Sequence, residues 1–275
     1  MSEAKIHIDT EPLVPKPSQE VIADPNTAWH AIRGFDFAGL EAMLEDGLLP
    51  SDNQQDSAVC MSASPQLAWS TGREANSFYA YTLQDGISLA IGQEYPQYPT
   101  GNHGGFVDEV RQQRVEASAI KGIMLPEKSI DTPLGEVATT HEARKPLKAQ
   151  HYIERTIQHI ADLGGQIDDQ ALDLVSVALE KSLAGNILDK DTSAGVERAF
   201  MTAYADTLTQ MYGIENPTVG DILKIIFDKA QVKPEVFAYT DEQKREIGTA
   251  NAKIAAKSPA RGIGSFGTMS AFRDW

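Results

Sequence analysis

Hydrophobic positions recur with two different spacings along the chain. Residues 27–126 hold short apolar runs separated by Gly, Pro and Asn, a pattern typical of short strands. Residues 147–257 instead hold apolar stripes at helical spacing, and the change falls between Pro126 and Pro146. We therefore predict two consecutive domains with a terminal segment on either side. The predicted segments are a flexible arm at 1–20, an α+β domain at 21–135, a helical domain at 147–257 and a Gly-rich tail at 258–275.

One helix of the first half has sequence signals at both ends. Asp36 is a suitable N-cap, the apolar residues from Phe37 to Leu44 recur at helical spacing, and Gly47 ends the pattern. A second helix is expected at 65–81. Strands are predicted at 28–32, 58–62, 86–92, 106–115 and 120–125. This order of elements favours an α+β fold over a doubly wound parallel sheet, and the sequence has no glycine-rich phosphate loop of either common type.

The second half is expected to form four or five amphipathic helices. Asp168 is a suitable cap for the second of them, Pro217 precedes the fourth, and Thr240 with Gln243 resembles a capping box that opens a fifth. Short loops between such helices favour an antiparallel bundle. The apolar stripes of the first four consist of Ile153, Ile157 and Ile160; Leu172, Val175, Leu179 and Leu183; Val196, Phe200, Leu208 and Met211; and Ile222, Ile225 and Ile226.

Charge and cysteine content narrow the class of protein. The formal net charge of -15 argues against long nucleic acids as partners, because such binding depends on clustered Lys and Arg. A dinucleotide pocket needs only a few local donors, so the charge does not exclude one. A single cysteine, Cys60, excludes an internal disulfide and suits a reducing compartment. Because no apolar run approaches the roughly 18 residues of a membrane span, we expect a protein that is cytoplasmic or injected into a host cell.

Three segments of the first half occur in the order found in a known enzyme family. WHAIRGFDFAGLEAMLEDGLLPS, at 29–51, resembles the opening of the ADP-ribosyltransferase family, where a strand with a histidine leads into a helix ending in Gly-Leu-x-Pro. AVCMSASPQLAW, at 58–69, is similar to the second element, a strand ending in Ser-x-Ser before a helix. GISLAIG, at 86–92, follows where another core strand is expected. The resemblance implies a split β-sheet domain that uses NAD.

The last segment, FVDEVRQQRVEASAIKGIMLP at 106–126, resembles the stretch of poly-ADP-ribose polymerases and related toxins that carries the catalytic glutamate. In that stretch the glutamate is followed by apolar positions six, eleven and fourteen residues later, with a lysine at twelve. Here Val115, Ile120, Lys121 and Ile123 stand at those offsets from Glu109. The resemblance therefore selects Glu109, rather than Glu116, as the catalytic glutamate.

The resemblance also implies roles for individual residues. Cleavage of NAD passes through an oxocarbenium-like ribose, so a carboxylate beside the ribose hydroxyls stabilises the transition state more than the ground state. Glu109 corresponds to that carboxylate. His30 corresponds to the histidine that holds an adenosine-ribose hydroxyl. The remaining residues expected to contact NAD are Ala31, Arg33, Ser62, Trp69 and Tyr79.

The sequence departs from the family pattern at the nicotinamide. Cys60 or Met61 stands where one tyrosine is expected, and Trp69 where a second is expected. Ala31 replaces the glycine that follows the family histidine. These departures are compatible with an altered cofactor pose, with stacking by Tyr79 or Tyr81, or with an inactive relative. A toxin-like alternative combines Arg33 with Ser62 and Ser64, but Val107 stands where its paired glutamate is expected.

Each candidate also fits a structural role. His30 beside Trp29 fits a hydrogen-bonded strand histidine, and Glu109 fits a solvated strand carboxylate. Ser62 and Ser64, which precede Pro65, fit a turn and a helix cap. The aromatic candidates fit a hydrophobic core.

Two patterns resemble metal sites only superficially. His151, Glu154 and His159 share a predicted helix. The two histidines are eight residues apart, which places them about 12 Å apart along its axis, too far for one ion without other ligands. Asp189 begins a stretch like a calcium loop, yet Ala194 and Phe200 replace the required glycine and glutamate. We expect a polar interhelical loop at 189–193 and no metal.

The expected function is transfer of ADP-ribose from NAD, as substrate, to a protein or small-molecule acceptor. The helical domain would recognise the acceptor or another protein partner, as in bacterial effectors and toxins of the family that the sequence resembles. Two alternatives remain open: an inactive ADP-ribosyltransferase-fold binding module, and a related RNA 2'-phosphotransferase. The acidic charge disfavours the last, because an RNA phosphate requires basic residues.

Overall fold

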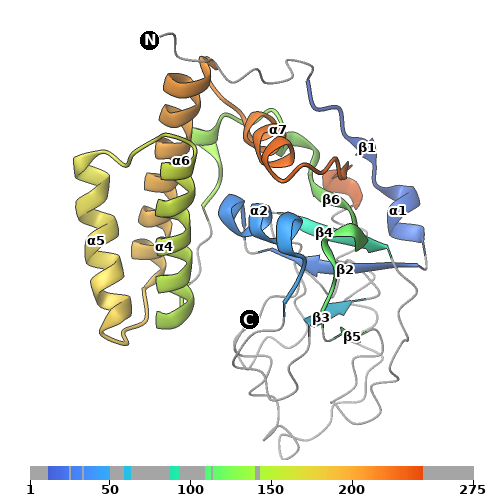
Figure 1. Cartoon of the computed structure of the whole chain (residues 1–275), viewed down its shortest axis with the longest axis horizontal. Coiled ribbons are helices and arrows are strands. Elements are labelled where there is room, and N and C mark those ends of the chain that lie inside the picture. The colour runs from blue at the N-terminus through green and yellow to red at the C-terminus, as the bar shows by residue number, and fades with distance from the viewer. Residues whose placement is uncertain are drawn as a thin grey trace, which may run out of the picture. The chain divides into compact units, whose positions relative to one another are not determined.

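Two compact units that alternate along the chain make up the protein (Figure 1). The computed structural model describes residues 12–24, 26–32, 34–49, 59–62, 87–92, 109–112, 114–139 and 143–243, without the side chains of 31, 60, 62 and 109–112. The helical unit consists of Met1–Val14, Gly34–Ala42 and Lys128–Lys233. The sheet unit consists of Pro15–Arg33, Met43–Glu127 and Pro234–Trp275. The predicted domains were consecutive, whereas each observed unit is assembled from three separate segments of the chain.

A seven-stranded mixed sheet forms the framework of the sheet unit. Its strand order is β1-β7-β6-β4-β2-β3-β5; β7 pairs in parallel with both β1 and β6, and the other pairs are antiparallel. The five strands predicted in the first half are confirmed as β2 to β6. The strands are β1 (Lys16–Pro17), β2 (Thr27–Ala31), β3 (Val59–Ser62), β4 (Ser88–Gly92), β5 (Glu109–Gln112), β6 (Ile120–Pro126) and β7 (Glu235–Tyr239). Mixed helices and strands agree with the predicted α+β class, and the described strands form one continuous sheet.

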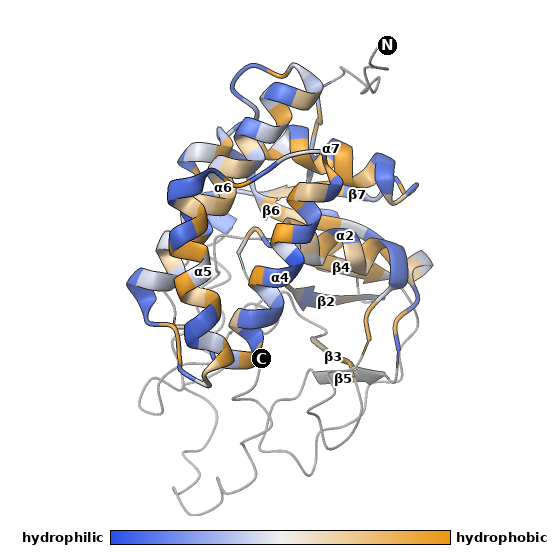
Figure 2. Cartoon of the chain, turned by 60° about the vertical axis from the view of Figure 1, so that its left-hand side comes forward, coloured by the Kyte–Doolittle hydropathy of each residue, from blue (hydrophilic) through white to orange (hydrophobic). Residues whose placement is uncertain are grey.

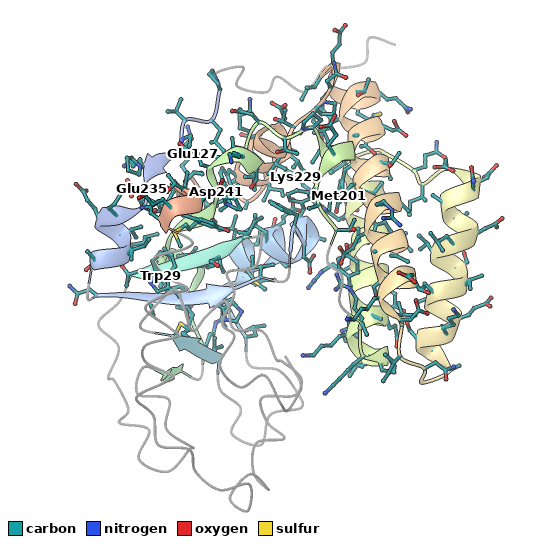
Figure 3. The ribbon with its side chains drawn as sticks, turned by 180° about the vertical axis from the view of Figure 1, so that it is seen from behind. Trp29, Glu127, Met201, Lys229, Glu235 and Asp241 are labelled. Atoms are coloured by element: carbon teal, nitrogen blue, oxygen red, sulfur yellow. The ribbon has the colours of Figure 1, made fainter. Side chains whose placement is uncertain are left out.

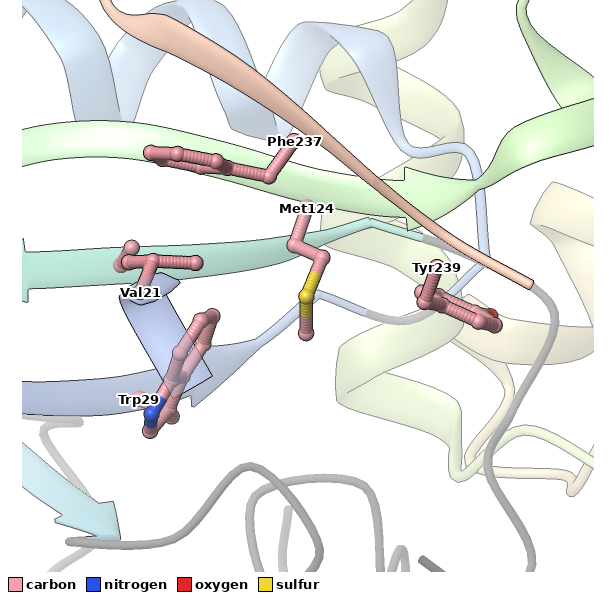
Figure 4. Close-up of a cluster of buried hydrophobic side chains, with 6 residues drawn as sticks. Val21, Trp29, Met124, Phe237 and Tyr239 are labelled. Carbon is pink, nitrogen blue, oxygen red and sulfur yellow. The ribbon is translucent and has the colours of Figure 1, made fainter. Parts of the chain in front are cut away.

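Helix α1 (Gln19–Ala23) contributes to the apolar core of this sheet (Figure 4). The core contains one α1 residue together with side chains from the central strands and β7. Trp29 is wholly buried, and opposite residues such as Trp29 and Ala90 share a sheet face because side chains alternate along each strand. The cluster consists of Val21, Trp29, Ala90, Met124, Phe237 and Tyr239. Burying these side chains stabilises the sheet unit by about 1.5–3 kcal/mol for each large one.

Strands β1 and β7 were not predicted. Residues 1–20 were expected to be a flexible arm, but Lys16 pairs with Phe237 and Ser18 is fully buried. Residues 235–239 were placed in the helical domain, but they form β7 of the sheet unit, between β1 and β6. Both assignments are wrong because β7 pairs with β1 and with β6, and each partner lies more than a hundred residues away in sequence. Local hydrophobic spacing carries no information on such partners.

Helix α2 (Phe37–Asp46) has the ends that its sequence predicts. The Asp36 carboxylate accepts a hydrogen bond from the Gly39 amide at 2.8 Å. Gly47 ends the helix with a φ of +79°, and an added Cβ there would lie 2.1 Å from the Val115 carbonyl oxygen, so the position requires glycine. The helix begins in a segment of the helical unit and ends in a segment of the sheet unit.

Four long helices dominate the helical unit: α4 (Pro146–Asp162), α5 (Asp169–Leu183), α6 (Lys190–Tyr212) and α7 (Val219–Lys229). They confirm the four helices expected from the apolar stripes, and Figure 1 shows α4, α5 and α6 side by side. Asp168 and Asp189 cap α5 and α6, and Thr218 forms a capping box with Asp221. Residues 189–193 were expected to be a loop, but Asp189 is the N-cap of α6 and residues 190–193 are its first turn. Short 3-10 helices lie at Ala117–Ala119, Glu127–Ser129 and Leu134–Glu136.

The fifth predicted helix is described only at its start. The Thr240 amide donates to the Gln243 side chain at 2.8 Å, and the Gln243 amide donates to the Thr240 hydroxyl at 3.2 Å. This reciprocal pair confirms the predicted capping box. The predicted helix at 65–81 and the tail at 258–275 lie outside the described residues. No helix in the described part of the chain is both long and apolar enough to span a membrane.

Candidate functional site

Only some of the predicted site residues fall in the described part of the sheet unit. His30 and Ala31 lie on β2, Ser62 ends β3 and Glu109 begins β5. Arg33, Trp69 and Tyr79 lie outside the described residues, as do Ser64 and Tyr81. The structure therefore bears on the strand positions of four candidates.

Strand pairing aligns two of these candidates in one row across the sheet. Glu109 on β5 lies opposite Ser62 on β3, and Ser62 lies opposite Trp29 on β2. Neighbouring strands are about 4.8 Å apart, so the Glu109 and Trp29 backbones are separated by about 10 Å. The row crosses the sheet where β3 ends and β5 begins.

His30 occupies the next position along β2, opposite Leu89 of β4. Trp29, labelled in Figure 3, has its indole in the apolar core. Successive strand residues point to opposite faces, so half-buried His30 lies on the other face from Trp29. The backbone thus brings the strands of His30, Ser62 and Glu109 together, with Glu109 in the row of Trp29 rather than in that of His30.

Glu116, the other glutamate of the same segment, has a surface role. Its carboxylate is 3.1 Å from Arg114 Nε, and the two side chains are 61% and 53% exposed. Arg114 also donates to the Asp46 carbonyl oxygen at 3.2 Å, next to the end of α2. The contacts of Glu116 are those of an exposed ion pair, which contributes little to stability.

A different polar constellation is buried in the helical unit. His159 of α4 makes two hydrogen bonds: Nδ1 is 2.7 Å from the Tyr204 hydroxyl on α6, and Nε2 is 3.1 Å from Glu41 Oε2 on α2. Lys229 of α7, labelled in Figure 3, lies with Nζ 2.8 Å from Glu41 Oε1. Phe37 packs edge-on against the Tyr204 ring, with centroids 5.5 Å apart. These contacts join α2, α4, α6 and α7.

Hydrogen bonding and burial shift the pKa values of Glu41 and Tyr204 in opposite directions. Burial alone would raise the pKa of Glu41, but hydrogen bonds from His159 and Lys229 hold that pKa below its ordinary value. Burial raises the pKa of the Tyr204 hydroxyl well above its usual range, so the phenol keeps its proton. The protonated phenol is placed to donate to His159 Nδ1, and Nε2–H then donates to the Glu41 carboxylate.

A second buried group lies between α4 and α6. The Arg144 guanidinium donates to Glu197 and stands 3.9 Å above the centre of the Tyr152 ring, and both charged residues are almost fully buried. Arg155 of α4 pairs with Asp36, which caps α2. The Arg155–Asp36 pair attaches the segment Gly34–Ala42 to α4 of its own unit.

A carboxylate, an imidazole and a phenol in sequence resemble a proton relay, but burial argues for a structural role. His159 and Tyr204 are only 5% and 1% exposed, so a substrate does not reach their polar atoms in this conformation. His151 and Glu154, weighed with His159 as metal ligands, are exposed while His159 points inward. Sequence reasoning missed the constellation, since Glu41 and His159 are 118 residues apart. The one local signal was that His159 adjoins the apolar stripe ending at Ile160.

Comparison with known proteins found no matching family model, no matching curated protein and no matching solved structure.

Proposed function

We propose that the sheet unit cleaves NAD at the nicotinamide ribose and transfers ADP-ribose to an acceptor. The observation that supports this most directly is strand pairing: Glu109 lies opposite Ser62, which lies opposite the neighbour of His30. Three candidates separated by 32 and 47 residues in sequence thus lie on adjacent strands. A site assembled from several strands requires that residues distant in sequence lie on neighbouring strands.

Glu109 has the electrostatic role in this proposal. Positive charge develops on the ribose as the bond to nicotinamide breaks, and a fixed carboxylate stabilises that charge only once it has formed. Glu116 is the rejected alternative, because its carboxylate is exposed and paired with Arg114. The acceptor then attacks the anomeric carbon, forms the new bond to ribose and releases its proton to solvent.

The other candidates position the cofactor. His30 holds a ribose hydroxyl, Ala31 and Ser62 contribute contacts from β2 and β3, and Arg33 pairs with a phosphate. Trp69 or Tyr79 supplies a flat face against nicotinamide. Because the chain carries a net charge of -15, we expect NAD to bind through these local donors and its affinity to change only mildly with salt, unlike that of a polyanion.

Release of nicotinamide from NAD, with and without an acceptor mixture, tests the proposal. The full-length chain should release nicotinamide and, with acceptor, transfer label from adenine-labelled NAD to it. His30→Ala should weaken NAD binding and lower turnover together, because an orienting contact acts in both the ground and transition states. Binding of NAD without any nicotinamide release would refute the proposal.

That last result would instead support a non-catalytic NAD-binding module. One structural observation favours this second candidate: His30 and Trp29 face opposite sides of the sheet, and Glu109 shares the row of Trp29. A catalytic site using both His30 and Glu109 must therefore bring together groups from two neighbouring rows. Nicotinamide release distinguishes the two candidates without knowledge of the acceptor.

A further inference from the structure

Exposed apolar side chains are concentrated on helix α5 and the turn that follows it. Nine large hydrophobic residues are exposed in the described part of the chain, and five of them lie between residues 172 and 187. Figure 2 shows apolar residues at several turns of α5. These five are Leu172, Leu174, Val177, Leu183 and Ile187. A helix that is apolar on several sides is normally covered on several sides.

Two stripes, one buried and one largely exposed, run along α5. The inner stripe, made of Val175, Ala178 and Ser182, is buried in the helical unit. Leu172 and Leu183 are exposed and Leu179 is half-buried. These three leucines are separated by seven and four residues, which places them on one line along the helix. We call this line the outer stripe; it lies about a quarter of a turn from the inner one.

Charged residues border the outer stripe on one side. Asp169, Asp173 and Glu180 fall on the flank that points away from the inner stripe, and all three are exposed. Lys181, the only basic residue of α5, falls on the far side of the helix. The outer stripe is therefore an apolar line with an acidic border.

The acidic border decides which occupant fits. A second copy of α5 packed antiparallel on this stripe would place aspartate and glutamate against aspartate and glutamate, which is unfavourable. A parallel copy would place them against the flank of the inner stripe, which is already buried in its own unit. The net charge of -15 adds to that repulsion. A helix with an apolar stripe and Lys or Arg beside it would bury the leucines and pair with the acidic border.

We propose that the outer stripe of α5 is a docking site for a basic amphipathic helix of a partner protein. Leu172, Leu179 and Leu183 bind the partner's apolar residues, spaced at i, i+4 and i+7. Asp169, Asp173 and Glu180 select Lys or Arg on its flank. The 15 residues of α5 are about 22 Å long, so four turns of a partner helix cover the stripe. This site does not depend on NAD chemistry.

Fluorescence anisotropy with the full-length chain tests the proposal. The probe is a synthetic peptide of about 18 residues, or about five turns, with leucines at i, i+4 and i+7 and lysines beside them. A peptide of the same composition in scrambled order measures binding by charge alone. A third peptide has glutamates in place of the lysines. The lysine peptide should bind about tenfold or more tightly than either of the others.

Variants of the chain test whether peptide binding depends on the outer stripe or only on the net negative charge. The paired substitutions Leu172→Ser and Leu183→Ser should lower the affinity for the lysine peptide about tenfold or more. Met211→Ser, which changes an exposed apolar residue of α6, should leave the affinity for the lysine peptide unchanged. Asp173→Lys with Glu180→Lys should reverse the preference toward the glutamate peptide. Circular dichroism checks that each variant keeps its helical content.

Three results would overturn the proposal. One is equal binding of the scrambled and amphipathic lysine peptides, which would reduce the effect to net charge. Another is a lysine-peptide affinity that the paired leucine substitutions leave unchanged. The third is a dimer of the chain in sedimentation equilibrium that the same leucine substitutions dissociate, because the stripe would then be an interface between two copies.

Discussion

Glu197→Gln removes one charge from the buried ion pair of the helical unit and leaves Arg144 as a cation in an almost fully buried position. Breaking such a pair from one side typically costs about 3–5 kcal/mol, because the remaining charge has lost both solvent and partner. The Tyr152 ring, with its centre 3.9 Å from the guanidinium carbon, still offsets part of that cost, about 1–2 kcal/mol. We therefore expect a loss of about 3 kcal/mol in the free energy of unfolding.

Urea denaturation followed by far-ultraviolet circular dichroism measures this loss. Glu154→Gln makes the same chemical change on the exposed face of α4, where Glu154 accepts a hydrogen bond from Gln150, and should cost less than about 0.5 kcal/mol. Replacing both partners, with Arg144→Met and Glu197→Leu, should restore most of the stability lost by Glu197→Gln. If Glu197→Gln and Glu154→Gln destabilise equally, the buried pair does not have the role assigned to it.

Two further predictions concern stability in acid and the contribution of segment 34–42 to the helical unit. The hydrogen bond from Lys121, followed by those from Asn26 and Thr27, lowers the pKa of Asp24 to about 2. The resulting contribution to stability is present above the ordinary pKa of an aspartate and is lost as the pH falls from about 4 to about 2. Lys121→Met should raise the pKa of Asp24 measured by NMR titration. A fragment of residues 128–233 lacks the Glu41 carboxylate and the rest of segment 34–42, so it should melt at a lower temperature than the full-length chain; equal melting would contradict the role of that segment.

Elements with strong local signals were predictable from sequence. Asp36 and Gly47 fix the ends of α2, and Asp168 and Thr218 cap helices whose apolar stripes are regular. Strand β7 was not predictable, because its five residues follow a long helical region and are stabilised by a distant partner, β6. Local sequence likewise does not predict that segment 34–42 belongs to the helical unit, because contacts such as that of Glu41 with His159 depend on tertiary packing.

The candidate site was predictable in composition but not in arrangement. Sequence offsets selected Glu109 within its segment, and the choice between it and Glu116 depends on those offsets together with the exposed ion pair of Glu116. The register that places Glu109 opposite Ser62 is a property of strand pairing, and a shift of one residue would change the face of every side chain. Hydrophobic spacing alone does not set that register in strands of four or five residues.

The most direct test of the central claim compares nicotinamide release by Glu109→Gln and Glu116→Gln. Glu109→Gln keeps the size of the side chain and removes its charge, so turnover should fall by about 10²–10³-fold while NAD affinity stays nearly unchanged. Glu116→Gln changes only an exposed pair with Arg114 and should retain full turnover. Nicotinamide release that survives Glu109→Gln, or that collapses on Glu116→Gln, would contradict the assignment of Glu109 as the catalytic carboxylate.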